Sequence, residues 1–221
     1  MKYKHYSQAR KELIHRLGEY CSYCEMHLDA SLAVEHVKPK KPRGMAEVDR
    51  RRALDWDNFL LSCANCNSVK GAGDIDLDDY VWPDRDNTYR AFQYSEGGLV
   101  AAAESLDGRL QRNALNMINL VGLNKICGQV KASDRRWLNR REAWDLAVRA
   151  KERLVGNDCL ELREQIAETA QAKGFWSVWM TVFKADGDML QRLIEAYPGT
   201  CRDCFTIGKH YEPTARQGGK C

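Results

Sequence analysis

Two Cys-x-x-Cys pairs constrain the fold of this chain more than any other feature of its sequence. Cys21 and Cys24 form the first pair, and Cys63 and Cys66 form the second. Each pair places two thiolates on one tight turn, and two such pairs supply the four ligands of a tetrahedral zinc ion. Because four protein ligands close the coordination sphere, we expect a structural zinc site that ties two distant segments together.

Two other interpretations of these cysteines stay open, namely a redox-active pair and four unrelated buried thiols. A redox pair typically lies at the start of a helix that follows a strand, as in thioredoxin-like proteins. That use needs a single pair in a thioredoxin-like pattern, which is missing here, so zinc is the favoured interpretation. A further pair, Cys201 and Cys204, leaves open a second metal site that His210 and Cys221 would complete.

The composition is that of a globular protein. The 221 residues suffice for one compact unit or two modest ones, with 44% hydrophobic and 29% charged residues. The first residues contain no apolar signal segment, and no stretch approaches the roughly 20 apolar residues of a membrane helix. We therefore expect a cytoplasmic protein, in which nine reduced cysteines favour metal binding over disulfides.

Positive charge is concentrated between the two cysteine pairs, although the net charge of the chain is only +3. From residue 38 to residue 52, seven basic residues stand against two acidic ones, which gives a local charge of +5. The basic residues are Lys38, Lys40, Lys41, Arg43, Arg50, Arg51 and Arg52. Such a run is usually a solvated loop, but its position beside a candidate site favours a role in binding.

The pattern of the sequence changes near residue 102. Residues 1–102 combine a short amphipathic helix with turns and short strands, among them a hairpin that pairs residues 91–94 with 99–102. Residues 103–221 show helical periodicity in four stretches, at 109–123, 134–155, 159–172 and 189–197, and Ser133 is the expected N-cap of the second. We therefore expect an α+β fold in which a small zinc-pinned module is followed by a mainly α-helical bundle.

His36 lies inside the segment between the cysteine pairs. Residues 32–37 and 56–62 are predicted to form two strands, and residues 66–71 a helix that Gly71 ends. Strand alternation places Glu35 and His36 on opposite faces unless the chain bends before Pro39. A lone histidine is usually structural, but nearby Asn58 and Asn67 favour a functional one.

These segments resemble an HNH endonuclease of the ββα-metal class with zinc-binding Cys-x-x-Cys pairs. The resemblance rests on Glu35-His36-Val37-Lys38-Pro39-Lys40, Trp56-Asp57-Asn58-Phe59-Leu60-Leu61-Ser62-Cys63 and Cys66-Asn67-Ser68-Val69-Lys70-Gly71. It implies that His36 is the general base, that Asn58 holds the His36 loop, and that Glu35 and Asn67 bind a catalytic divalent ion. The family often has Asp and His where this chain has Glu35 and Asn67, and the oxygen ligands present here suit Mg²⁺ or Mn²⁺.

The chemistry of phosphodiester hydrolysis suits such a set of residues. A neutral imidazole can activate water near pH 7, and a divalent ion can neutralise charge on the phosphate and the leaving oxygen. We therefore expect two metals, a structural Zn²⁺ and a catalytic Mg²⁺ or Mn²⁺. The residues expected to contact the backbone of a DNA or RNA substrate are Lys38, Lys40, Lys41, Arg50, Arg51, Arg52 and Lys70.

A narrower resemblance concerns the rest of the chain. Residues 82–88, 175–183 and 198–200 are similar to the HNH effector subunit of Septu-type and retron-associated antiphage defence systems. This resemblance implies a partner ATPase with an ABC/SMC-like core, docked on the helical part. Two alternatives stay open: a zinc module that binds nucleic acid without cutting it, and an adaptor in which the HNH region only scaffolds a complex.

The tryptophans of the helical part allow two interpretations. They are Trp137, Trp144, Trp176 and Trp179. Aromatic residues at helical spacing are more often core residues than stacking platforms for bases, so we expect a core role.

Overall fold

A computed structural model describes residues 3–30 and 32–221. The fold consists of helices and short antiparallel two-stranded ribbons. The helices are α1 (Arg10–Leu17), α2 (Arg50–Leu54), α3 (Ala64–Lys70), α4 (Thr88–Ala91), α5 (Gly108–Val121), α6 (Arg136–Gly156), α7 (Leu160–Lys173), α8 (Trp176–Val182) and α9 (Gly187–Ala196). The strands are β1 (Ala33–His36), β2 (Phe59–Ser62), β3 (Phe92–Ser95), β4 (Leu99–Ala102), β5 (Phe205–Thr206) and β6 (Glu212–Pro213). They pair in chain order into three two-stranded antiparallel sheets, which confirms the expected α+β class.

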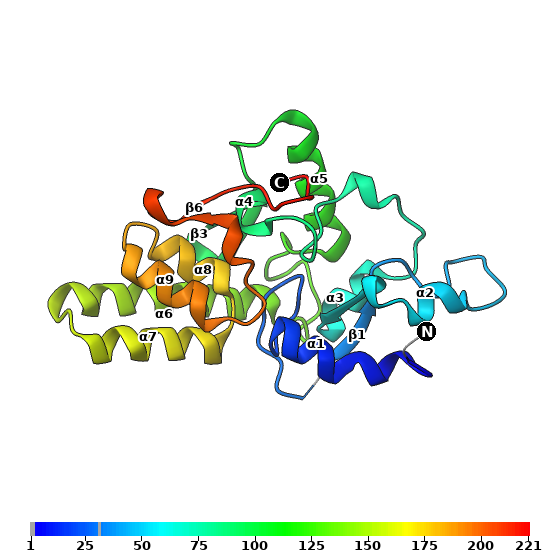
Figure 1. Ribbon diagram of the computed structural model, residues 1–221, viewed down its shortest axis with the longest axis horizontal. Coiled ribbons are helices and arrows are strands. Elements are labelled where there is room, and N and C mark those ends of the chain that lie inside the picture. The colour runs from blue at the N-terminus through cyan, green and yellow to red at the C-terminus, as the bar shows by residue number, and fades with distance from the viewer. Residues whose placement is uncertain (1–2, 31) are drawn as a thin grey trace.

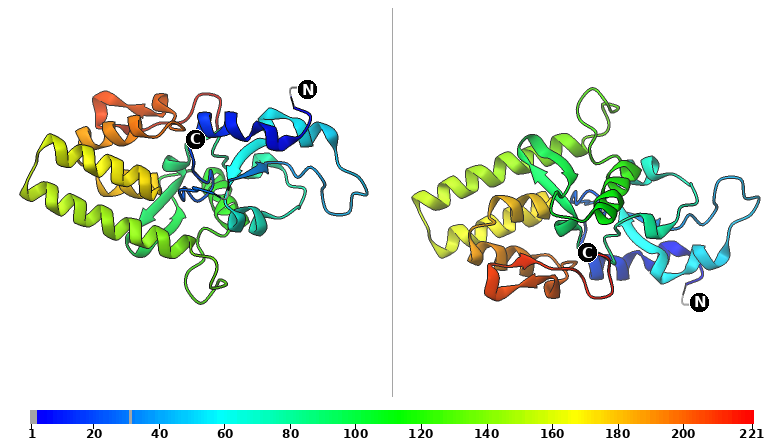
Figure 2. Two further views of the ribbon diagram at one scale, coloured as in Figure 1. Left: turned by 90° about the horizontal axis from the view of Figure 1, so that it is seen from below. Right: turned by 90° about the horizontal axis from the view of Figure 1, so that it is seen from above.

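The two ends of the molecule differ in structure. Helices α1, α2 and α3 surround the β1–β2 ribbon at one end, and α6, α7, α8 and α9 form a helical group at the other (Figure 1). Helix α5 and the C-terminal residues lie between these two groups. Figure 2 shows from two further sides that α6 and α7 extend away from the N-terminal end.

The predicted strand–strand–helix order is present between the two cysteine pairs. Strands β1 and β2 pair with Glu35 opposite Leu60 and His36 opposite Phe59. Helix α3 follows directly and ends at Gly71, whose φ of 65° suits glycine. The second strand is shorter than predicted because residues 56–58 form a 3-10 turn, in which the Asp55 carboxylate accepts a hydrogen bond from the backbone N–H two residues on.

The remaining predicted elements are present with small shifts. The opening helix begins as a 3-10 turn over residues 6–9 and becomes α1 at Arg10. The predicted hairpin is the β3–β4 pair. The expected N-cap at Ser133 is wrong, because α6 begins after Arg135 without a side-chain cap. The Asp134 carboxylate instead accepts a hydrogen bond from the backbone N–H of Arg136.

The hydrophobic core continues across residue 102. One cluster joins Leu60 of β2 and Trp82 to Met117 of α5 and Val178 of α8. A second cluster fills the helical group around Trp179, which is fully buried, and Trp144 and Trp176 pack against it. Three of the four tryptophans therefore contribute to the core, as expected, whereas Trp137 is half-buried and belongs to neither cluster. Among the described residues, no helix is both long enough and apolar enough to cross a membrane.

Candidate functional site

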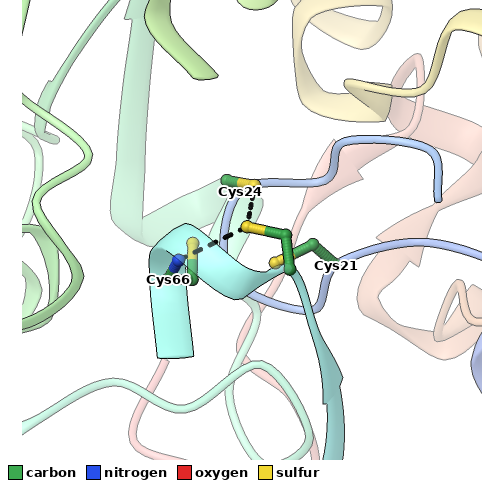
Figure 3. A group of neighbouring side chains, drawn as sticks. Cys21, Cys24 and Cys66 are labelled. Atoms are coloured by element: carbon green, nitrogen blue, oxygen red, sulfur yellow. Dashed lines mark hydrogen bonds between the residues drawn. The ribbon is translucent and has the colours of Figure 1, made fainter. Parts of the chain in front are cut away.

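The four cysteines of the two pairs form one buried group. Their sulfur atoms all lie within 4.8 Å of one another. The sulfur atoms of Cys24 and Cys63 are 3.8 Å apart, and a tetrahedral zinc ion with Zn–S bonds of about 2.3 Å requires a separation of about 3.8 Å. In Figure 3 the sulfurs of Cys21, Cys24 and Cys66 face a common centre. The donor set and its spacing therefore fit the expected zinc ion.

Two hydrogen bonds to sulfur hold this cluster in place. The backbone N–H of Cys66 donates to Sγ of Cys63 over 3.3 Å, which also caps α3. Nη1 of Arg136, from α6, donates to Sγ of Cys66 over 3.1 Å. The Arg136 side chain is buried and binds the Asp134 carboxylate through two further nitrogens. The cysteine cluster is thus supported by a helix distant from it in the sequence.

His36 is buried where β1 ends. Its ring packs edge-on against Phe59 and Tyr6, with ring centroids 5.2 and 5.1 Å away. Nε2 lies 3.3 Å from the carbonyl oxygen of Ala53. Because a carbonyl can only accept a hydrogen bond, Nε2 carries the proton and Nδ1 keeps a free lone pair. Burial, reinforced by the charges of Lys40 and Lys70 and opposed by the Ala53 contact, lowers the pKa of His36 to about 4, so the ring is neutral at pH 7.

Asn58 binds the loop that follows His36. Its Oδ1 accepts a hydrogen bond from the backbone N–H of Lys38 over 2.7 Å, and its Nδ2 donates to the carbonyls of Lys38 and Arg52 over 2.8 Å each. The backbone N–H of Val37 donates to the Asn58 carbonyl. Asn58 therefore joins the end of β1 to the segment that carries the Ala53 carbonyl.

Glu35 forms a buried ion pair with Lys70. Nζ of Lys70 lies 2.8 Å from Oε1 of Glu35, and it also donates to the backbone carbonyl of His36 over 2.9 Å. Burial raises the pKa of Glu35, and Lys70 opposes that rise. Glu35 thus faces α3, whereas His36 faces Tyr6, as the unbroken β1–β2 register requires. Asn67 lies on α3, three residues before Lys70 and on the same face of the helix.

The basic residues of the site differ in their exposure to solvent. Lys41, Arg50 and Arg51 are exposed, and Lys38, Lys40 and Arg52 are half-buried. Lys70 differs from all of these, because its side chain is only 2% exposed and is engaged by Glu35. The prediction that Lys70 contacts a nucleic-acid backbone is therefore corrected: the helix turns its side chain inward, where the buried carboxylate needs a partner.

The second metal site left open by the sequence is not assembled. Sγ of Cys221 is 3.6 Å from the backbone carbonyl of Asn87. Across residues 3–30 and 32–221, the buried group of four cysteines is the one set of three or more His, Cys, Asp or Glu side chains spaced for a metal ion. Cys201, Cys204, His210 and Cys221 therefore do not form a second group.

One segment of the chain combines three features. They are the four-cysteine cluster, the strand–strand–helix order and a neutral histidine at the end of the first strand. Residues 21–73 match the HNH endonuclease family. This HNH domain contains both cysteine pairs together with Glu35, His36, Asn58 and Asn67. The family match indicates metal-dependent nuclease activity, and it ends before the helical part. No curated protein matches the chain.

Two structural features of the HNH domain were not predicted from the sequence. The hydrogen bond from Arg136 to Cys66 joins residues 70 positions apart, and no local pattern marks it. The ion pair between Lys70 and Glu35 has a weak sequence signal, because a helix of seven residues that packs on a ribbon must turn one face inward.

Proposed function

We propose that this protein is an endonuclease that hydrolyses phosphodiester bonds of nucleic acid with His36 as the general base. The observation that carries the proposal is the state of the imidazole, which is neutral and has one nitrogen engaged by the Ala53 carbonyl. Nδ1 is then the atom that takes a proton from the attacking water. Asn58 acts as a positioning residue, because it binds the backbone of Lys38, two residues after the histidine, and that of Arg52, beside the Ala53 carbonyl.

Glu35 and Asn67 are the proposed ligands of the catalytic Mg²⁺ or Mn²⁺. Their oxygen atoms suit hard divalent ions, and the Lys70 ammonium beside Glu35 indicates that this buried carboxylate requires positive charge. When bound, such an ion would neutralise charge on the phosphate and the leaving oxygen. The zinc cluster has no open ligand position and keeps a structural role.

The substrate is proposed to be DNA or RNA, held through its backbone. The proposed phosphate contacts are Lys38, Lys40, Lys41, Arg50, Arg51 and Arg52, all of which are exposed or half-buried. Contacts of this kind release counterions, so binding should weaken as salt is added and depend little on sequence.

A role in antiphage defence in the cytoplasm, with an ABC/SMC-like ATPase as partner, is proposed from the resemblance of residues 82–88, 175–183 and 198–200. The helical part of residues 103–221 is the proposed docking region. Val155 and Leu160, at the turn between α6 and α7, are 84% and 54% exposed and would be covered by a partner.

One observation favours the alternative of a zinc-stabilised binding or adaptor protein without cleavage activity. Glu35 and His36 leave opposite faces of β1, so the carboxylate and the imidazole do not converge on one point in this structure. A protein of that kind would bind nucleic acid in a salt-sensitive way without needing a divalent ion.

Cleavage of plasmid, single-stranded DNA and RNA by the purified chain with Mg²⁺ or Mn²⁺ tests the proposal. We expect His36→Ala to lower the rate by about 10²- to 10⁴-fold, while the control His15→Ala, at an exposed position of α1, leaves it unchanged. Zinc content and circular dichroism should be the same in all three proteins. Equal rates for wild type and His36→Ala would contradict the proposed base. If the wild type cuts nothing even with the partner ATPase, yet binds the substrates in a salt-sensitive way, the alternative holds.

A further inference from the structure

The loop of residues 40–49 projects from the HNH domain between β1 and α2. Figures 1 and 2 show that this part of the chain extends past α2, at the edge of the molecule. The start of the loop lies close to His36, because both contact the ring of Tyr6. The centroids of the His36 and Tyr6 rings are 5.1 Å apart, and Nζ of Lys40 is 3.8 Å from the Tyr6 centroid. The 40–49 loop is thus connected to the proposed general base through one aromatic ring.

Backbone hydrogen bonds give the 40–49 loop a defined shape. The N–H of Asp49 donates to the carbonyl of Lys40 over 2.8 Å, which closes the base of the loop. The N–H of Met45 donates to the carbonyl of Pro42 over 3.1 Å, which closes a tight turn, and Pro42 is buried. Gly44, the third residue of that turn, has a φ of 90°, which glycine adopts readily. The turn therefore anchors Met45 at the outer part of the loop.

Two large apolar side chains are exposed on this loop. Met45 is 56% exposed and Val48 is 48% exposed. Single exposed apolar residues are common on protein surfaces, but two of them on one projecting loop indicate a contact with another molecule. A projecting loop fits into a groove of its partner, so the partner is expected to supply the groove.

Basic side chains flank the two apolar ones. Those exposed on the loop and at the start of α2 are Lys41, Arg43, Arg50 and Arg51. The negative charge of Asp49 is partly offset, because Nε of Arg52 lies 3.5 Å from its carboxylate. An apolar tip between cations matches a groove of nucleic acid, in which stacked bases lie between two rows of phosphates. This charge favours nucleic acid over a protein as the partner of the loop.

We propose that the 40–49 loop enters the minor groove of duplex DNA and inserts Met45 between two base pairs. Methionine is one of the apolar side chains that proteins insert between base steps, and such insertion kinks the duplex by about 20–90° toward the major groove. Val48 adds apolar contact inside the groove, and the flanking cations bind the phosphates. Duplex DNA fits better than duplex RNA, whose minor groove is wide and shallow. The inference rests on the proposed binding of nucleic acid, and it adds the kind of substrate and the way in which it is held.

Energy transfer between dyes at the two ends of a DNA duplex of about 25 base pairs tests the proposal, because a bend brings the dyes closer together. The full chain is titrated into the duplex without Mg²⁺ or Mn²⁺, so that the DNA stays intact. We expect energy transfer to rise as the wild type saturates the duplex. Met45→Ala should bind about tenfold more weakly, and its saturated complex should show little of that rise.

The salt dependence of binding separates the inserted side chain from the phosphate contacts. Met45→Ala removes no cation, so the slope of log affinity against log salt concentration should equal that of the wild type. Arg50→Gln should reduce this slope by about 1 and leave the bend of the saturated complex unchanged. Leu160→Ala, which replaces an apolar residue that is 54% exposed at the start of α7, is the matched control and should change neither quantity.

The outcomes distinguish this inference from the proposed function. If the wild type binds the duplex without bending it, or if Met45→Ala bends it equally, the inserted methionine is refuted and the proposed nuclease is unaffected. Tighter binding of a single strand than of the duplex would also overturn the inference. If the wild type binds no nucleic acid at all, the proposed function fails together with it. Circular dichroism should be the same for all variants, because each replaced side chain is exposed.

Discussion

Arg136 donates a hydrogen bond to the sulfur of Cys66 over 3.1 Å, and this contact joins α6 to the cysteine cluster. Four thiolates with one Zn²⁺ would carry a net charge of −2, and a buried guanidinium beside them would offset part of that charge. The first cysteine turn is joined to the helical group as well, because the Glu25 carboxylate accepts hydrogen bonds from the backbone N–H and hydroxyl of Ser177. The zinc-type cluster therefore supports the packing of the helical part as well as the HNH domain.

Replacing Arg136 should destabilise both parts together. Arg136→Met leaves the Asp134 carboxylate and the Cys66 thiolate without their cation, so we expect the free energy of unfolding to fall by about 3–5 kcal/mol. Urea denaturation followed by circular dichroism measures this, and a colorimetric zinc assay follows metal retention. Arg149→Met, at an exposed position of the same helix, is the control. Equal denaturation midpoints for the two variants would show that the contact contributes nothing.

Removing the Asn58 side chain should lower the cleavage rate and leave the zinc content unchanged. Asn58→Ala loses all three side-chain hydrogen bonds to the His36 loop and the Arg52 carbonyl. A misplaced general base costs on the order of a hundredfold in rate, so we expect a fall of that size with unchanged zinc content. Asn157→Ala, at the exposed end of α6, is the matched control. A rate equal to that of the control would argue against a positioning role.

The ion pair between Glu35 and Lys70 should show strong coupling. Lys70→Met leaves a buried carboxylate unpaired, so we expect a loss of about 3–5 kcal/mol in the free energy of unfolding without divalent ions. The double variant Glu35→Gln/Lys70→Met should recover most of it. Added Mg²⁺ should restore part of the stability of Lys70→Met, because an ion at Glu35 replaces the lost charge. Lys41→Met, at an exposed position, is the control. If the losses of stability in Glu35→Gln and Lys70→Met simply add in the double variant, the two side chains are not coupled.

Asp84 should lower stability at neutral pH. Because burial raises its pKa, the folded protein holds this proton to a higher pH than the unfolded chain does. The stability of the wild type therefore falls as pH rises from about 4, near the pKa of an unfolded aspartate, toward the raised pKa of the folded state. Asp84→Asn removes that loss, so we expect it to be more stable than wild type at pH 7 by about 1–3 kcal/mol and close to wild type at pH 4. Thermal melts of both proteins measure this difference, with Asp203→Asn, at an exposed position, as control. A less stable Asp84→Asn at pH 7 would refute the expectation.

Local patterns in the sequence were sufficient for β1, β2 and α3 of the HNH domain, whereas α2 was not predicted. The spacing of the cysteines, the alternation of β1 and the glycine at position 71 depend on residues close together in the chain. The helices α5, α6, α7 and α9 follow from their own periodicity in the same way. Both strands are shorter than predicted, and β2 begins late because the Asp55 side chain competes locally for a backbone N–H.

Long-range packing determined the rest. The burial of Lys70 follows from how α3 lies on the ribbon, and the contact between Arg136 and Cys66 follows from how α6 packs on the cluster. A cavity of about 150 Å³ beside the first cysteine turn is lined by segments that are up to about 200 residues apart, from Leu17 to Arg216. Which of these segments meet depends on how the two hydrophobic clusters are filled, and that depends on the shapes and volumes of many side chains at once. Charge and spacing along a sequence carry no such information, so only the tertiary structure placed these groups.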